Sequence, residues 1–267
     1  MKKKRKNKKI KFKYILYFIP LIIILFVFYY FKYCYKKIDF LEDRVNYVTQ
    51  TQKNDTSEKT TIGWIRVQGT NIDMPVVYFE NEKYKDDPRE SFAWNNTKDK
   101  HIRKKVDLLG HNILNLSSNP DINKENYRRF ESLMAFVYYD FAQKNQYIEY
   151  TIDGKNYLYK IFGVRVLKGY DKVDPVNNFD FDKKDAVNYL NTINEDNIYK
   201  YKVKVSSDDN FITLITCTRF YGSFTQASLA VDARMVRKGE RITNYPVEKT
   251  DNYKKILKYM KGDENNV

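Results

Sequence analysis

Two residues of this chain could act together as a nucleophile and its base: Cys217 and His111. Cys217 ends the apolar, β-branched run FITLITC (residues 211–217), and His111 follows Gly110 at the end of the short run VDLLG (106–110). A thiol reacts as the thiolate, and a nearby imidazole can take up its proton. A cysteine in a strand can equally be a small buried hydrophobe. The two residues alone therefore leave a structural role open for each.

The remaining histidine and cysteine do not extend this pair into a metal site. His101 lies in the charged run KDKHIRKK, where we expect a solvated surface side chain, and Cys34 lies near the N-terminus. Two histidines and two widely separated cysteines form no recognisable ligand cluster. No glycine-rich phosphate loop is present in the sequence either. We therefore expect no metal and no cofactor, and no disulfide between the two cysteines.

The N-terminus has the pattern of a membrane anchor. A basic segment without acidic residues (1–13) precedes an uncharged apolar stretch, and we predict a transmembrane helix over 14–33. A secretory signal peptide has a shorter apolar core that ends in small residues, whereas this one ends in YYFKYCYKK. Because the positive charges precede the span, we expect a cytoplasmic N-terminus and an extracellular remainder, in a single-pass protein of the cell membrane.

The charge of the chain follows from this anchor. The net charge is +14, but residues 1–37 hold 12 of the 48 basic residues and no acidic one. The rest of the chain has 36 basic and 34 acidic residues, a net charge of +2. No basic helix with interleaved aromatic residues stands out, so we do not expect a nucleic acid partner.

The remaining sequence predicts a mostly β fold. Residues 34–61 are predicted to form a membrane-exit helix and linker, 62–240 a closed barrel of short strands with a few short helices, and 241–267 a tail with a short amphipathic helix. Asp153-Gly154 predicts a type I′ hairpin turn. A helix is predicted over about 182–193, with its apolar face formed by Ala186, Val187, Leu190 and Ile193.

Two motifs together resemble the sortases, the cysteine transpeptidases of Gram-positive cell surfaces. These are TLITC (213–217) and, about a hundred residues earlier, LLGHN (108–112). GWIRVQGTNIDMPVV (63–77) is similar to the opening strands of that family, and the likeness extends over most of residues 62–240. The helix before the cysteine strand and the N-terminal anchor are similar to the class B branch.

The resemblance implies an eight-stranded barrel and a thioacyl mechanism. Cys217 would cleave a sorting signal in a secreted protein, and an amine of a cell-wall precursor or of a pilin would resolve the thioacyl enzyme. His111 would serve as general acid and base. Thr216 would support the setting of the cysteine, although a threonine is also an ordinary strand residue. The resemblance leaves open the sorting motif, and whether the product is an anchored protein or a pilus.

The sequence departs from the family at an arginine. Sortases use an arginine on the strand after the cysteine, which donates hydrogen bonds to the substrate and its oxyanion. Aligning SLAVDARMV by its apolar alternation places Ser228 there, whereas matching the motif DARMV places Arg234 there. Arg219, two residues after the cysteine, is a third candidate. The two alignments exclude each other, and Arg234 and Arg219 remain the candidate arginines.

Two other kinds of protein remain as alternatives. One is a catalytically impaired protein with a sortase fold, which the departure from the family at the arginine position suggests. The other is a cell-surface binding or assembly protein, which would need neither Cys217 nor His111. A papain-like protease is disfavoured, because its cysteine precedes its histidine in the chain and opens a helix.

Overall fold

The computed structural model describes residues 19–20, 22–28, 44–81, 92–95, 97–112, 130–168, 181–222 and 225–260. The chain divides into two units, Met1–Glu42 and Asp43–Val267. In the first unit, residues 19–20 and 22–28 are helical. Among the described residues, no helix has the length and apolar character needed to cross a bilayer. The basic segment 1–13 and the other residues of the predicted anchor lie outside the described residues.

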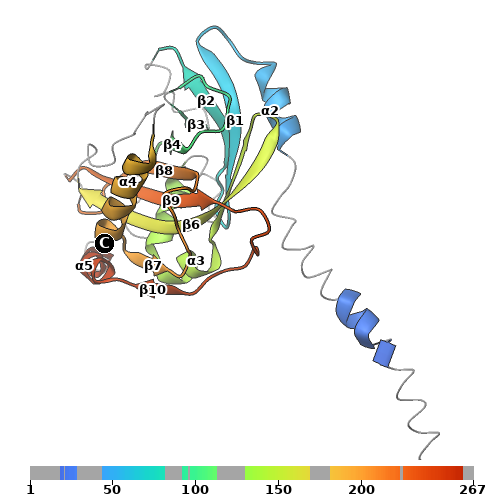
Figure 1. Ribbon diagram of the computed structural model, residues 1–267. Helices are drawn as coiled ribbons and strands as arrows, with labels where there is room; N and C mark the ends of the chain where they lie inside the picture. The colour runs from blue at the N-terminus through green and yellow to red at the C-terminus, as the bar shows by residue number, and fades with distance from the viewer. Residues whose placement is uncertain are drawn as a thin grey trace, which may run out of the picture. The chain divides into compact units, whose positions relative to one another are not determined.

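The second unit contains a barrel closed in the strand order β1-β2-β3-β4-β8-β9-β6-β5, with β5 pairing back onto β1 (Figure 1). β3 contributes only two residues, so the other seven strands form most of the wall. The predicted mostly β barrel with a few short helices is confirmed. The strands are β1 (Lys59–Val67), β2 (Asp73–Phe79), β3 (Ala93–Trp94), β4 (Lys105–Leu109), β5 (Tyr147–Ile152), β6 (Lys155–Lys168), β8 (Phe211–Thr218) and β9 (Ala227–Met235).

Most neighbouring strands of the barrel are antiparallel, with two exceptions. β2 pairs with β3 and β4 pairs with β8 in parallel. Parallel strands cannot be joined by a tight hairpin and need a long connection. β4 and β8 are accordingly separated by about a hundred residues of sequence, and their pairing brings the two predicted functional motifs together.

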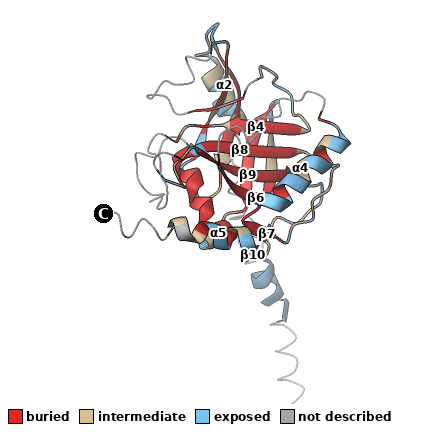
Figure 2. Cartoon of the chain, turned by 90° about the vertical axis from the view of Figure 1, so that its left-hand side faces the viewer, coloured by how far each residue is buried: buried red, intermediate tan, exposed pale blue. Residues whose placement is uncertain are grey.

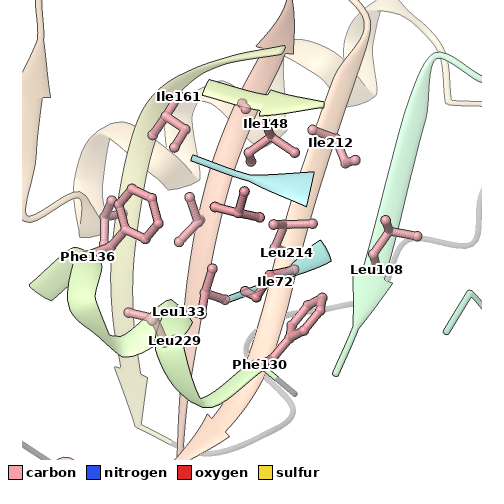
Figure 3. Close-up of a cluster of buried hydrophobic side chains, with 14 of the residues drawn as sticks. Ile72, Leu108, Phe130, Leu133, Phe136, Ile148, Ile161, Ile212, Leu214 and Leu229 are labelled. Carbon is pink, nitrogen blue, oxygen red and sulfur yellow. The ribbon is translucent and has the colours of Figure 1, made fainter. Parts of the chain in front are cut away.

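The barrel interior is filled by aliphatic side chains and closed by a buried 3₁₀ helix, η2 (Phe130–Val137). All eight residues of η2 are buried. Figure 3 shows Phe130, Leu133 and Phe136 against the strands that carry Leu214 and Leu229. Because every residue of this helix is buried, Glu131 and Ser132 included, other elements must cover it on all sides, and here the barrel supplies that cover. The short helix α3 (Tyr139–Lys144) follows.

The predicted hairpin turn at Asp153-Gly154 is confirmed. It joins β5 to β6, whose register pairs Ile152 with Lys155. Asp153 and Gly154 have φ values of 55° and 65°. A type I′ turn requires positive φ at both central positions, which aspartate and glycine tolerate best.

The predicted helix before the cysteine strand is confirmed as α4 (Lys183–Asp196). Asp182 caps it, accepting a hydrogen bond from Asp185 N at 2.8 Å. Ala186 and Ile193 are buried as predicted. The placement of Val187 on the buried face is wrong, because its side chain is 45% exposed while Tyr189 packs against the barrel instead. Figure 2 shows the exposed side of α4 on the barrel surface.

β7 (Tyr199–Tyr201), β10 (Val247–Lys249) and α5 (Asp251–Met260) form a group of neighbouring elements outside the barrel. β7 and β10 form a separate two-stranded sheet. β7 takes up only the first three residues of the alternating run YKYKVKV (199–205). The helix α5 follows β10, and its buried residues Tyr253 and Ile256 lie on one face, as expected of the short amphipathic helix predicted in the tail. Figure 2 shows α5 beside β7 and β10.

The helix α2 (Val45–Gln52) precedes the barrel and packs on β1. Arg44 at its start forms an ion pair with Asp73 of β2 at 2.7 Å. The ring of Tyr47 lies 5.4 Å from that of Trp64 on β1. The part of the predicted membrane-exit helix that precedes residue 44 lies outside the described residues.

Candidate functional site

The parallel register of β4 and β8 brings the two strand exits together. The register runs from Lys105↔Phe211 to Leu109↔Ile215, and in every pair the residue number in β8 is 106 higher than that in β4. Gly110 continues it, because its amide donates to Ile215 O at 3.0 Å. Extending the same difference by two residues from Leu109 places His111 opposite Cys217. Paired positions of neighbouring strands lie on the same face of a sheet, so the two side chains start from adjacent points.

Cys217 is the exposed residue of β8. All the remaining residues of the strand are buried, including Thr216 and Thr218 on either side of the cysteine. A thiol inside the core would be unreactive, and this one is accessible to solvent.

Thr216 fastens the exit of β8 to that of β4. Its side chain is buried, and its Oγ1 donates a hydrogen bond to Gly110 O at 2.7 Å. This bond joins the residue before Cys217 to the residue before His111. The hydrogen bond to Gly110 is the contact through which Thr216 could support the position of Cys217, as predicted.

His111 is half-buried and leaves β4 at a crowded point. Its carbonyl oxygen accepts a hydrogen bond from Phe130 N of η2 at 3.1 Å. A Cβ atom at Gly110 would lie 2.2 Å from the Phe130 ring, so no larger residue fits before the histidine without displacing η2. His101, in contrast, is exposed, with Nδ1 3.5 Å from Asp153 Oδ1 at the hairpin turn.

The register of β8 and β9 decides between the two alignments of the arginine. Cys217 pairs with Ser228, whereas Arg234 pairs with Phe211 at the other end of the strand. Six residues of strand at about 3.3 Å each separate positions 228 and 234, or about 20 Å. The placement of Arg234 beside the cysteine is therefore wrong, and the buried Ser228 occupies the position opposite Cys217.

Arg234 has a structural role instead. It is fully buried, and its Nη1 and Nη2 donate to the two carboxylate oxygens of Glu240 at 2.5 and 2.6 Å. A bidentate pair of this kind is strong and directional. The hydrogen bond from Arg234 lowers the pKa of Glu240 to about 2. Sequence matching alone could not separate this role from a catalytic one.

Arg219 stays close to the cysteine in the chain. It is half-buried and begins a turn in which Gly222 N donates to Arg219 O at 2.8 Å. No carboxylate within the described ranges pairs with its guanidinium. Of the two candidate arginines, Arg219 is the one at the end of the barrel that carries Cys217.

A buried polar cluster lies on the same outer face, further along the strands. Asp232 of β9 accepts hydrogen bonds from Arg165 at 2.7 and 3.0 Å, from Thr213 of β8 at 2.9 Å and from Tyr189 of α4 at 2.9 Å. These bonds attach α4 to the barrel wall. The motifs and spacings of the sequence did not predict this cluster; the only signal of it is the presence of charged residues within otherwise apolar strands.

The same cluster contains an ion pair between Lys105 and Asp107, both on β4. Lys105 Nζ bonds to Asp107 Oδ1 and, at 2.9 Å, to Thr213 Oγ1. Asp107 Oδ2 is buried and accepts no hydrogen bond from the described residues. Burial raises the pKa of Asp107, and the charge of Lys105 opposes that rise. This carboxylate depends on Lys105 for its stability as an anion.

Cys217, His111 and Arg219 do not line the pocket that the described residues form between α4 and β7. This pocket has a volume of about 500 Å³, and Leu190, Asn194 and Tyr201 are among its lining residues. Within the described parts of the chain, no group of three or more histidine, cysteine, aspartate or glutamate side chains could hold a metal ion.

No family model matches the chain. Among proteins of known function it is similar to sortase B of Listeria monocytogenes, with 25% identity over 172 residues. That alignment covers 60% of this chain and 63% of the length of the listerial protein.

Solved structures of sortases share the fold. Sortase B of Clostridium perfringens is similar with a TM-score of 0.56 and 24% identity, over 71% of this chain and all of that chain. The sortase B–substrate complex of Staphylococcus aureus has a TM-score of 0.55 and 19% identity, over 70% of this chain and 84% of that one. In sequence and in fold, the chain is similar to class B sortases.

Proposed function

We propose that this protein is a cysteine transpeptidase in which Cys217 is the nucleophile and His111 the general acid and base. The observation that carries the proposal is the continuous β4–β8 register, in which an exposed thiol and an imidazole leave adjacent strands at the same end. A nucleophile and its base must lie within hydrogen-bond reach in the working complex.

The reaction has two acyl-transfer steps. The Cys217 thiolate attacks a peptide carbonyl carbon, the C–N bond breaks, and His111 donates its proton to the departing amine. The resulting thioester is attacked by a second amine, from which His111 accepts a proton, and the C–S bond breaks to release the thiolate. The acyl donor is the sorting signal of a secreted protein, and the acceptor is an amine of a cell-wall precursor or of a pilin.

The arginine of this site is proposed to be Arg219. The donor that stabilises an oxyanion must lie at the end of the barrel that bears the thiol, and Arg234 lies at the opposite end of β9. We further propose that residues 14–33 anchor the protein in the cell membrane, with residues after the anchor on the extracellular side.

A second candidate function has one observation in its favour. Ser228 stands opposite Cys217, at the position where sortases are expected to carry the arginine. Serine has no positive charge to stabilise an oxyanion. A protein of sortase fold with impaired catalysis is therefore the alternative, and its role would be binding of the same extended peptides.

The proposal is tested by incubating the full chain in detergent with a library of sorting-signal peptides. We expect a thioacyl adduct on Cys217 by mass spectrometry and release of the C-terminal peptide fragment. Cys217→Ala is the control and should form neither. A folded wild-type chain that binds peptides but yields no adduct and no fragment would favour the impaired protein instead.

A further inference from the structure

The C-terminal helix α5 is fixed at its first turn to the end of α4 and to β7. Asn252 Nδ2 donates to Glu195 O at 2.6 Å, and Thr250 Oγ1 donates to Asn197 O at 2.7 Å. The buried ring of Tyr253 lies 5.4 Å from that of Tyr199. The start of the helix is thus held by hydrogen bonds and by aromatic packing.

The other end of α5 reaches the segment that follows Cys217. The ring of Tyr259 lies 4.7 Å from the ring of Tyr221 at an interplanar angle of 87°, and 6.2 Å from that of Phe220. Edge-to-face pairs at such distances are favourable beyond the area that they bury. α5 therefore connects the end of α4 to the turn 219–222.

That turn is held from three directions. Phe220 is buried in the main core cluster, and its amide donates to Thr218 Oγ1 at 3.2 Å. The hydroxyl of Tyr221 donates to Val166 O of β6 at 2.8 Å. Lys168 Nζ lies 5.1 Å from the centre of the Tyr221 ring. Tyr259 adds the contact from α5.

The position of this turn determines how β8 ends. Cys217 is the penultimate residue of the strand, and only Thr218 separates it from Arg219, where the turn begins. Thr218 still pairs with Ala227 of β9. A looser turn would free the last strand pair, and the backbone of Cys217 and Arg219 would sample more conformations.

We propose that Tyr259 is a positioning residue: through Tyr221 and Phe220 it holds the turn 219–222, and with it the end of β8 that carries Cys217. The C-terminal helix thereby becomes part of the support of the site, although it lies outside the barrel. The consequence for turnover rests on the function proposed above, whereas the order of the turn does not.

The order of the turn is measured by amide hydrogen exchange on the full chain. In Tyr259→Ala, we expect the amides of Phe220 and Gly222 to exchange about three- to tenfold faster, which matches the loss of one aromatic pair. Tyr259→Phe keeps the ring and should exchange as wild type does. Tyr47→Ala removes a comparable aromatic pair on α2 and should leave these two amides unchanged. Should Tyr259→Ala not fold, Tyr259→Leu keeps an apolar side chain there and is read in the same way.

Peptide cleavage then measures the consequence for the site. In an active chain, we expect Tyr259→Ala to lower kcat about three- to tenfold with little change in KM, because a misplaced thiol weakens the chemical step. Unchanged exchange at Phe220 and Gly222 would overturn the proposal, as would faster exchange with wild-type kcat. If wild type itself cleaves no peptide, the proposed function fails, and hydrogen exchange still decides whether Tyr259 holds the turn.

Discussion

Cys217 and His111 are ordinary residues until the strands that carry them are paired. The exposed position of Cys217 in β8 makes the thiol accessible, and the contact of Thr216 with Gly110 ties it to the histidine strand. Neither residue type by itself shows that the thiol is accessible or that the histidine lies on the neighbouring strand. The chemical roles proposed for them rest on the two positions together.

At the residue scale, the role of the imidazole is tested by His111→Gln. We expect kcat/KM for peptide cleavage to fall about 10²- to 10⁴-fold, the usual loss when a general acid and base is removed. His101→Gln is the matched control, because His101 is exposed at the hairpin turn and should leave the rate unchanged. A His111→Gln chain with wild-type kcat/KM would exclude His111 from the mechanism.

Removal of Arg219 should affect catalysis, whereas removal of Arg234 should affect stability. Arg219→Ala should lower kcat about 10²- to 10³-fold, as expected for the loss of an oxyanion donor, with an unchanged Tm. Arg234→Met should leave Glu240 without its main partner and lower the free energy of unfolding by about 3–5 kcal/mol. Kinetics and thermal unfolding of both variants check these outcomes. Full activity of Arg219→Ala would mean that catalysis proceeds without this cation.

At the scale of elements, ion pairs fix the far end of β9 and the outer face of β4. Arg234 and Glu240 join β9 to the segment after it, and Lys105 and Asp107 lie side by side on β4 beneath Tyr189 of α4. Both pairs contain buried charges, so each should respond sharply to the loss of one partner.

The Arg234–Glu240 pair makes stability depend on pH at the acidic end. The pKa of Glu240 is lowered to about 2 in the folded protein, and an unfolded glutamate titrates near about 4.3. The stabilisation is therefore complete above about pH 4.3 and is lost as pH falls toward about 2. We expect Glu240→Gln to lower the Tm at pH 6 and to converge on wild type near pH 2. An equal Tm difference at both pH values would contradict this ion pair.

The Lys105–Asp107 pair is tested by a double-mutant cycle. Lys105→Met leaves the Asp107 carboxylate buried without its cation, and we expect a loss of about 3–5 kcal/mol in the free energy of unfolding. Adding Asp107→Leu removes the stranded charge and should restore most of that loss. Urea unfolding at pH 7 measures Lys105→Met, Asp107→Leu and the double variant. Additive losses in the double variant would show that the two side chains are not coupled.

At the scale of the whole molecule, the chain combines a compact barrel unit, which begins at Asp43, with a basic and apolar N-terminal unit. The positive charge of the protein belongs mainly to the N-terminal unit, because residues 1–37 hold 12 basic residues and no acidic one, and the rest of the chain is nearly neutral. This division is what the proposed extracellular enzyme on a membrane anchor requires.

The proposed anchor predicts the distribution of the chain between cell fractions. We expect the full chain to sediment with membranes and to resist extraction at high pH, whereas a chain that begins at Asp43 should be released. Ile24→Lys in the full chain is the control, because a charge in the apolar stretch disfavours insertion. Recovery of the wild-type full chain in the extracted fraction would rule out the anchor.

The sequence by itself determined the local features of this protein. The Asp153-Gly154 turn, the Asp182 cap of α4 and the mostly β character follow from backbone preferences that act over a few residues. The chemistry open to Cys217 and His111 also follows from residue type alone. Such features need no knowledge of distant segments.

Only the tertiary structure decided which segments meet. It paired β4 with β8 in parallel, set Ser228 rather than Arg234 opposite Cys217, and turned Tyr189 of α4, in place of Val187, toward the barrel. The first two outcomes depend on the register between strands, where a shift of one residue would turn every side chain to the other face. The third depends on how α4 packs against the barrel. Register is fixed by packing across the whole barrel, so the short-range pattern of any one strand cannot specify it.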